Sequence, residues 1–183
     1  DGIPLPVINQ RPRLTWEQLT QRIVHCRRCP RLARYIRQVA SEKVRRYRQE
    51  RYWGKPLPGF GDVDARLLVV GLAPAAHGGT RTGRMFTGDG AGDWLIRVLY
   101  ETGFANQATS VARDDGLVLR EAYLTASARC APPGNRPTPE EIANCSHYLP
   151  SEQQLMPSVK VALALGQIAF DTCLRYLYPP VKP

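Results

Sequence analysis

A glycine-rich segment, residues 71–93 (GLAPAAHGGTRTGRMFTGDGAGD), carries most of the side chains that could do chemistry. A carboxylate, an imidazole, two guanidinium groups and a phenyl ring are supplied by Asp89, His77, Arg81, Arg84 and Phe86. Glycines let a backbone approach a ligand closely, and long loops in compact domains are usually functional or disordered. A plain surface loop with a helix-capping residue is the alternative. We favour a binding loop, because glycines and reactive side chains are concentrated together.

The residues on either side indicate how this loop is held. Residues 65–70 form an apolar run of strand length, and residues 94–100 have helical spacing. Residues 122–127 predict a second strand, and residues 158–165 predict a third, buried strand. Because strands alternate with helices, we expect an α/β fold with a parallel sheet covered on both faces. Ligands bind such sheets at the carboxyl ends of the strands, where the glycine-rich loop begins.

Other segments carry helix signals. Thr15 with Gln18, and Thr138 with Glu141, each fit a capping box at a helix start. Pro30 can open a helix, which we expect to continue into the polar residues 43–51 (KVRRYRQER). Residues 53–61 resemble a Pro/Gly connector, and residues 105–118 resemble a variable loop.

Four of the five cysteines fall into two pairs. Cys26 and Cys29 join two predicted helices, while Cys130 follows the second strand and Cys145 lies on the next helix. Four thiolates suit either Zn or an iron–sulfur cluster, and the spacing does not choose between them. Buried free cysteines are the alternative, which we favour for Cys173 on its apolar helix face. A four-thiolate site would tie the basic N-terminal helices to the loop after the second strand.

The net charge of +9 is unevenly placed. Residues 1–60 hold 14 basic and 4 acidic residues, whereas residues 61–183 are nearly neutral. Arginine, which makes bidentate phosphate contacts, dominates the basic residues. Genome composition could explain the arginine bias but not the asymmetry, so we favour a nucleic-acid partner. Tyr47 and Tyr52 interleave with arginines in a pattern that suits a nucleic-acid backbone and a solvated helix face equally well.

The length of 183 residues suits one domain over 1–183, with 1–60 as its basic helical part. No apolar run is long enough to cross a membrane. Residues 1–16 lack a signal-peptide core. We therefore expect a protein of the cytoplasm, and we expect it to be a monomer.

Four motifs together resemble the uracil-DNA glycosylase superfamily, specifically its family 5 enzymes with a [4Fe–4S] cluster. The motifs are CRRCPRL, GLAPAAHGGTRTGRMFTGD, RCAPPGNRPTPEEI with its following cysteine, and VALALGQIAF. The resemblance implies a three-layer α/β/α sandwich around a four-stranded parallel sheet. It also implies DNA repair by removal of uracil and other deaminated bases from DNA, in a cytoplasm of bacterial or archaeal type. The implied cluster ligands are Cys26, Cys29, Cys130 and Cys145, with Zn as the alternative metal.

The resemblance also implies a base pocket and its chemistry. Its wall would be formed by Gly71, Ala73, Pro74 and Ala75, with His77 close by. Other glycosylase families have a polar catalytic residue in the turn where this chain, like family 5, has Leu72 and Ala73.

The acid must then come from elsewhere in the chain, and Asp89 is the matching candidate. Phe86 matches the aromatic residue that stacks on the base, and Asn135 matches a polar residue near the base or the attacking water. We expect Arg81, Arg84 and Arg136 to contact DNA. The alternatives are a helix cap for Asp89, a core aromatic for Phe86, a turn residue for Asn135 and a loop residue for His77.

The chemistry of glycosidic cleavage fits these residues. The base must leave the stack, and the sugar then develops oxocarbenium character that a carboxylate can stabilise. Hydrogen-bond donors in a dry pocket stabilise the departing base anion. No lysine lies in these motifs, which argues against a Schiff-base lyase step.

One family motif has no counterpart here. Family members carry a His-Pro-Ser segment that inserts into DNA, and none of His25, His77 and His147 precedes Pro-Ser. We expect that segment and the fourth strand to lie outside the given residues. A non-catalytic iron–sulfur DNA-binding module is the alternative function, which the complete Asp89 loop disfavours. The basic N-terminal part disfavours an iron–sulfur electron carrier.

Overall fold

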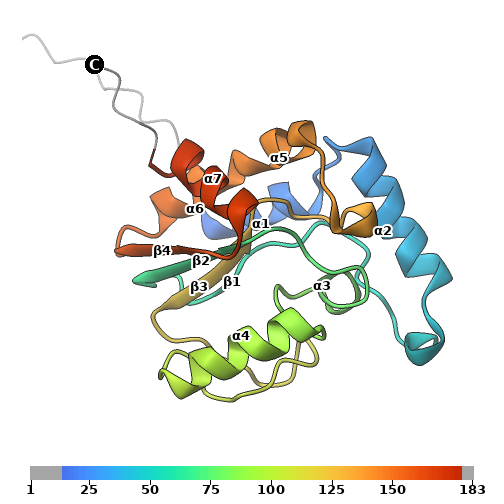
Figure 1. Cartoon of the computed structure of the whole chain (residues 1–183), viewed down its shortest axis with the longest axis horizontal. Helices are drawn as coiled ribbons and strands as arrows, with labels where there is room; N and C mark the ends of the chain where they lie inside the picture. Colours follow the sequence, from blue (N-terminus) through green and yellow to red (C-terminus); the bar gives the residue numbers. More distant parts are fainter. Residues whose placement is uncertain (1–13, 179–183) are drawn as a thin grey trace, which may run out of the picture.

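The computed structural model describes residues 14–178, and within them four strands form one sheet in the order β1-β3-β2-β4 (Figure 1). β2 (Leu67–Gly71) pairs in parallel with both β3 (Ala122–Ala126) and β4 (Val161–Ala164). The short β1 (Phe60–Gly61) runs antiparallel to β3. The predicted α/β class is therefore confirmed, with a sheet that is mostly parallel.

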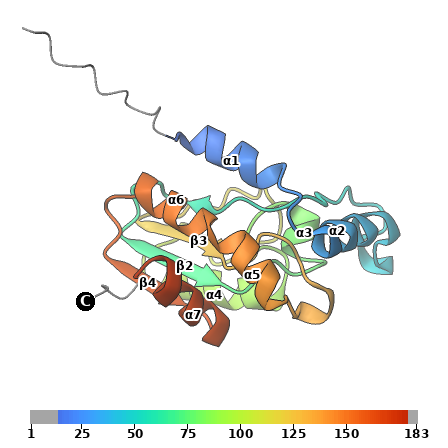
Figure 2. The ribbon, with the colours of Figure 1, turned by 90° about the horizontal axis from the view of Figure 1, so that it is seen from above.

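Helices cover both faces of the sheet (Figures 1 and 2). They are α1 (Trp16–Val24), α2 (Pro30–Glu42), α3 (Gly79–Thr82), α4 (Gly90–Glu101), α5 (Pro139–Ser146), α6 (Tyr148–Leu155) and α7 (Gln167–Tyr176). α4 packs on one face, and α6 and α7 pack on the other. The expected three-layer α/β/α arrangement is present.

The alternation of side chains along the strands builds two cores. Val69 and Leu124 point toward α4, where they join Ile96 and its neighbours. Leu68 and Tyr123 point the other way, into the core that α6 and α7 close. Successive residues of a strand face opposite sides of a sheet, so the apolar run before Gly71 fills both cores. This burial fixes where the glycine-rich loop leaves the sheet.

Local signals set the helix ends as expected. The Thr15 hydroxyl accepts the Gln18 N–H, and the Gln18 side chain accepts the Thr15 N–H in return. Thr138 and Glu141 form the same reciprocal cap on α5. Pro30 begins α2. Such caps satisfy backbone N–H groups that have no partner inside the helix.

The sheet departs from expectation at both edges. The fourth strand of the described range is β1, which lies in the residues assigned to the connector and is antiparallel. Gly61 allows this pairing, since its φ is +138° and a Cβ there would overlap the Ala122 carbonyl oxygen. β4 was expected to be buried, but Val161 is 56% exposed because the strand lies at the edge of the described sheet.

The predicted continuation of α2 through residues 43–51 is wrong. The helix ends at Glu42, Lys43 has a φ of +54°, and residues 45–47 form a 3₁₀ turn, η1 (Arg45–Tyr47). Closely spaced like charges disfavour a helix. Instead, Tyr47 and Glu50 contact a buried guanidinium of the glycine-rich loop.

Two further helix boundaries differ. The helix predicted to start after Thr138 and to carry Cys145 ends at Ser146 as α5, and a second helix, α6, follows from Tyr148. α4 begins at Gly90, before the expected start near Trp94, because Asp89 caps it. Within residues 14–178, no helix has the length and apolar character needed to span a bilayer.

Candidate active site

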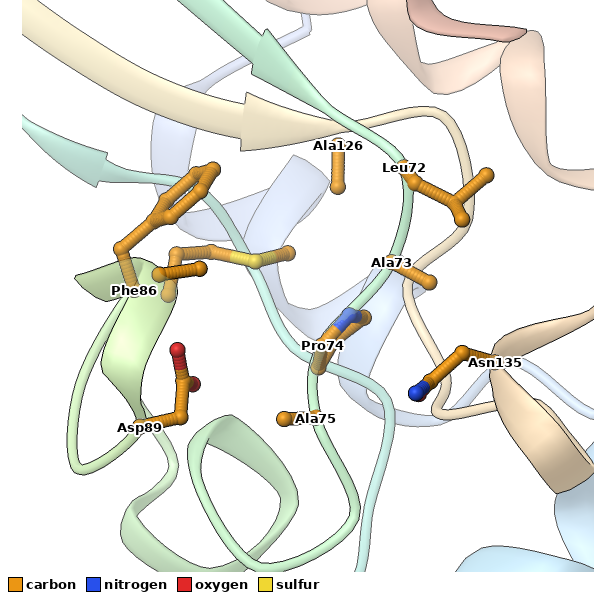
Figure 3. A pocket seen from close by; sticks show the side chains of 10 residues that line it. Leu72, Ala73, Pro74, Ala75, Phe86, Asp89, Ala126 and Asn135 are labelled. Atoms are coloured by element: carbon orange, nitrogen blue, oxygen red, sulfur yellow. The ribbon is translucent and has the colours of Figure 1, made fainter. Parts of the chain in front are cut away.

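A small cavity opens where β2 and β3 end (Figure 3). The last register pair of these strands is Gly71 with Ala126, and the chain continues from Gly71 into the cavity wall. The volume of the cavity is about 220 Å³. Its lining residues are Leu72, Ala73, Pro74, Ala75, Met85, Phe86, Asp89, Ala91, Ala126 and Asn135. Three of the four predicted wall residues, Ala73, Pro74 and Ala75, therefore lie in one place with Asp89 and Phe86.

The Phe86 ring lies against the backbone of Gly71. A Cβ on Gly71 would sit 2.6 Å from Cζ of that ring, so only glycine permits this approach. Phe86 itself has a φ of +50°, which is uncommon for a bulky residue. Strained backbone of this kind tends to occur at functional sites. Gly71 thus supports the aromatic face rather than forming wall by itself.

Asp89 has the two roles considered from the sequence, a cap and a group facing the cavity. Its Oδ1 accepts the Gly92 N–H at 2.9 Å, at the start of α4. Burial raises the pKa of the carboxyl above its ordinary value, and the negative charge of Asp93 raises it further, whereas the N–H groups of Gly92 and Ala91 lower it. The net effect is a raised pKa. A half-buried carboxylate in a cleft is a candidate for catalysis.

Asn135 reaches the cavity from the side opposite Asp89 (Figure 3). It ends the 3₁₀ turn η2 (Pro133–Asn135) with a φ of +57°, a conformation that asparagine tolerates better than most residues. The turn reading and the site reading are thus compatible. The next residue, Arg136, has an exposed side chain, and its carbonyl accepts a hydrogen bond from Arg31.

His77 and Arg81 tie the loop to the arginine-rich segment 43–52. The Tyr52 hydroxyl is hydrogen-bonded to His77 Nδ1 at 3.0 Å. The Arg81 guanidinium donates to the His77 carbonyl and pairs with Glu50. It also lies 3.9 Å from the centre of the Tyr47 ring. Neither His77 nor Arg81 lines the cavity. Both residues lie behind its wall, in contact with the arginine-rich segment.

The structure places Arg84, which we expected to contact DNA, inside the protein. Its side chain is 4% exposed and pairs with Asp115 at 2.8 Å. It also donates to the hydroxyls of Thr87 and Ser110. All of these partners are internal, so Arg84 fixes the loop to residues 110–115. The density of arginine in the motif did not reveal this, because the partners lie about 30 residues away along the chain.

Four lining residues were not among the predicted site residues: Leu72, Met85, Ala91 and Ala126. Leu72 lies within the predicted turn, and Ala126 could have been found because it lies near the end of the second predicted strand, where parallel strands meet at one edge of the sheet. Met85 and Ala91 flank the predicted Phe86 and Asp89, but nothing in their type marks them.

The four predicted cysteine ligands come from three separate places. Cys26 and Cys29 lie between α1 and α2, Cys130 follows β3, and Cys145 is on α5. Burial, followed by the charges of the other three cysteines, raises the pKa of the Cys130 thiol. Cys26 also packs against the small core cluster that contains Cys145. Cys173 lies apart in the core between the sheet and α7, as expected.

Zinc and an iron–sulfur cluster both accept four thiolates. Within residues 14–178, no group of three or more His, Cys, Asp or Glu side chains is arranged to hold a metal ion. Cys145 Sγ also accepts the Arg129 N–H at 3.1 Å, a donor that suits a thiolate bound to metal.

Comparison with known proteins identifies the family. Residues 58–181 match the sequence model of the uracil DNA glycosylase superfamily. A type-5 uracil-DNA glycosylase from Pyrobaculum aerophilum is 47% identical over 91% of this chain and 72% of its own length. The type-5 enzyme of Thermus thermophilus is 48% identical over 87% of this chain and 72% of its own. A type-4 uracil-DNA glycosylase from Thermotoga maritima is 36% identical over 61% and 52%, respectively. With the cavity, the sheet and these matches agreeing, the chain belongs to the uracil-DNA glycosylase superfamily and, within it, to the type-5 group.

Proposed function

We propose that this protein hydrolyses the N-glycosidic bond of uracil, and of other deaminated bases, in DNA. The observation that carries the proposal is the meeting of Phe86, Asp89 and Asn135 in one small cavity at the ends of β2 and β3 (Figure 3). The names of the type-5 relatives support uracil as the substrate base.

The cavity suits a single flipped ring. Its volume of about 220 Å³ is below the about 300 Å³ at which pockets for larger ligands begin. The target base must leave the stack to reach it. Phe86 offers a face for stacking, and Asn135 offers both a donor and an acceptor. The edge of uracil presents the complementary amide pattern.

Asp89 is placed to act on the sugar. When the glycosidic bond breaks, positive charge develops at the anomeric carbon. The carboxylate of Asp89 stabilises that charge and orients the attacking water. Asn135, on the opposite side of the cavity, donates to the departing base and stabilises its negative charge.

The reaction we propose stops at the abasic site. The residues that line the cavity include no lysine, so no amine is available there to form a Schiff base with the sugar. The products are the free base and an intact strand with an abasic site.

We further propose that Cys26, Cys29, Cys130 and Cys145 hold a [4Fe–4S] cluster. Support comes from the donor set of four thiols and from the buried N–H donated to Cys145. The cluster would be structural, because it would join α1 and α2 to the chain that leads to Asn135. Iron and sulfide content of the purified protein tests this: Cys130→Ser should lose both, and Cys173→Ser should keep both. Zinc in place of iron would contradict the proposal.

We propose that the protein acts as a monomer on DNA inside the cell, with the excess arginines of residues 1–60 facing the phosphates. Binding should weaken steeply with salt. A non-catalytic DNA-binding module would show the same salt dependence, so salt does not separate the two functions.

Product analysis separates them. A uracil-containing oligonucleotide is incubated with the protein, free base is measured by chromatography, and the strand is examined before and after alkali. We expect free uracil and a strand that breaks only after alkali. Binding without free base would favour the non-catalytic module, and breakage without alkali would contradict the single-step reaction.

A further inference from the structure

A second hollow adjoins the base cavity. Its volume is about 370 Å³, and Ala75, Asp89 and Asn135 line both spaces. Asp89 and Asn135 therefore stand at the boundary between them. If a base fills the first cavity with its anomeric carbon at Asp89, the strand must continue from that boundary. The second hollow is the adjoining space into which it can continue.

The walls of this hollow are suited to a nucleotide. Tyr35 of α2 and Tyr47 of η1 contribute two partly exposed aromatic rings. Gly78, Gly88 and Gly134 form other parts of the wall. Aromatic rings provide faces on which bases stack, and glycines let a sugar–phosphate chain approach closely.

The tyrosine wall is held in place by the active-site loop itself. The Arg81 guanidinium packs on the Tyr47 ring at 3.9 Å and pairs with Glu50. The Trp53 N–H donates to the Arg81 carbonyl at 2.9 Å. These contacts fix residues 47–53 relative to the residues around Asp89. A fixed aromatic wall loses little entropy on binding, which favours recognition.

The surroundings carry the charge that a DNA strand requires. Arg34 precedes Tyr35, Arg45 and Arg46 precede Tyr47, and Arg48 follows it, and all four side chains are exposed. Exposed arginines with interleaved aromatics are the usual composition of a single-strand binding groove.

We infer that this hollow binds the nucleotide next to the target in the same DNA strand, whose base stacks on Tyr35 and Tyr47. The inference rests on the proposed function and extends it from one nucleotide to two. It assigns the tyrosines a role in substrate binding rather than in bond cleavage. Loss of the neighbouring base should therefore raise KM and leave kcat unchanged.

The test uses single-stranded oligonucleotides that contain one uracil and a neighbour that is either a normal nucleotide or a stable abasic analogue. The neighbour is placed on the 5′ side in one series and on the 3′ side in another. Dissociation constants are measured by fluorescence anisotropy with Asp89→Asn protein, so that the strand stays intact. Because loss of a stacked base weakens binding, an abasic neighbour on one side should weaken binding about tenfold.

The variants locate the effect. In the double variant Tyr35→Leu/Tyr47→Leu, the abasic neighbour should weaken binding less than twofold, because both stacking rings are gone. Tyr35→Phe and Tyr47→Phe keep a ring and should keep the tenfold difference. Tyr100→Leu alters a 48% exposed tyrosine of α4 and serves as the matched control. Circular dichroism checks that each variant is folded.

Two results would overturn the inference. One is that the protein with both tyrosines binds the oligonucleotides with a normal and with an abasic neighbour equally tightly, on the 5′ and on the 3′ side. The other is that the double leucine variant binds both oligonucleotides more weakly by the same factor, so that the tenfold difference between them remains. If uracil is released but binding does not depend on the neighbouring base, the inferred second subsite is wrong and the proposed function stands. If binding depends on the neighbouring base but the unmodified protein releases no base, the proposed function is wrong and the second subsite stands.

Discussion

Asp89→Asn separates the two roles of this residue, since asparagine caps a helix about as well as aspartate does. The Gly92 N–H that Asp89 now accepts should keep its partner, but the charge is lost. Two unit charges 4 Å apart attract by about 4 kcal/mol at an effective dielectric constant of 20. The sugar carries only part of a charge in the transition state, so we expect a loss of about 3–4 kcal/mol. At about 1.4 kcal/mol per tenfold, the rate should fall by about 10²–10³-fold.

The stability of the same variant should change little. Burial raises the folded-state pKa of Asp89 above its ordinary value of 3.8. The protonated form is thus favoured in the folded protein, and stability is lost as pH rises through the folded pKa. Asparagine removes this cost but also forfeits the interaction with the helix dipole, which contributes about 0.3–1 kcal/mol. We expect the free energy of unfolding to change by less than about 1 kcal/mol.

The assay is single-turnover release of uracil from a single-stranded oligonucleotide, together with urea unfolding. The unmodified protein should also lose its rate as pH falls through the pKa of Asp89, which lies above 3.8. Asp89→Asn should lack this limb. A variant that keeps more than a tenth of the rate would refute the catalytic role. A variant that loses several kcal/mol of stability would show that the cap, and not the charge, was removed.

Three further substitutions have defined outcomes. Gly71→Ala places a Cβ 2.6 Å from the Phe86 ring and should displace this stacking face. We expect KM to rise about tenfold, and an unchanged KM would contradict this expectation. Glu152→Gln disrupts a buried ion pair in which Arg129 is 1% and Glu152 is 0% exposed. The free energy of unfolding in urea should therefore fall by about 3–5 kcal/mol. A fall of less than about 1 kcal/mol would contradict the importance of this pair. For Asp115, burial would raise the pKa, but hydrogen bonds from N–H groups and a guanidinium lower it below 3.8. The Asp115 carboxylate therefore stabilises the folded protein above pH 3.8, and this stabilisation is lost as pH falls through the pKa of the folded state. In urea unfolding, Asp115→Asn should be less stable than the unmodified protein at pH 7 and should lose less stability on acidification.

The sequence predicted those parts of the structure that depend on neighbours along the chain. The capping boxes at Thr15 and Thr138 each involve residues three apart, and the strand before Gly71 is an uninterrupted apolar run. The same holds for the glycine-rich loop as the site, because its glycines and reactive groups are adjacent. Phe86 and Asp89 were singled out in this way, and both line the cavity.

Distant contacts decided what the sequence could not. Arg84 looks like any exposed arginine until Asp115 is placed beside it. The helix that begins at Pro30 ends at Glu42 because Tyr47 and Glu50 contact Arg81 instead of extending it. Neither partner is near in sequence, so neither outcome follows from local propensity.

The measurement that tests the central claim most directly is a structure of the Asp89→Asn protein bound to a single-stranded oligonucleotide containing uracil. The account predicts the uracil ring against Phe86 inside the cavity, with its amide edge on Asn135 and its anomeric carbon facing residue 89. A uracil that remains stacked in the strand, or that binds in another hollow, would contradict the assignment of this cavity as the active site.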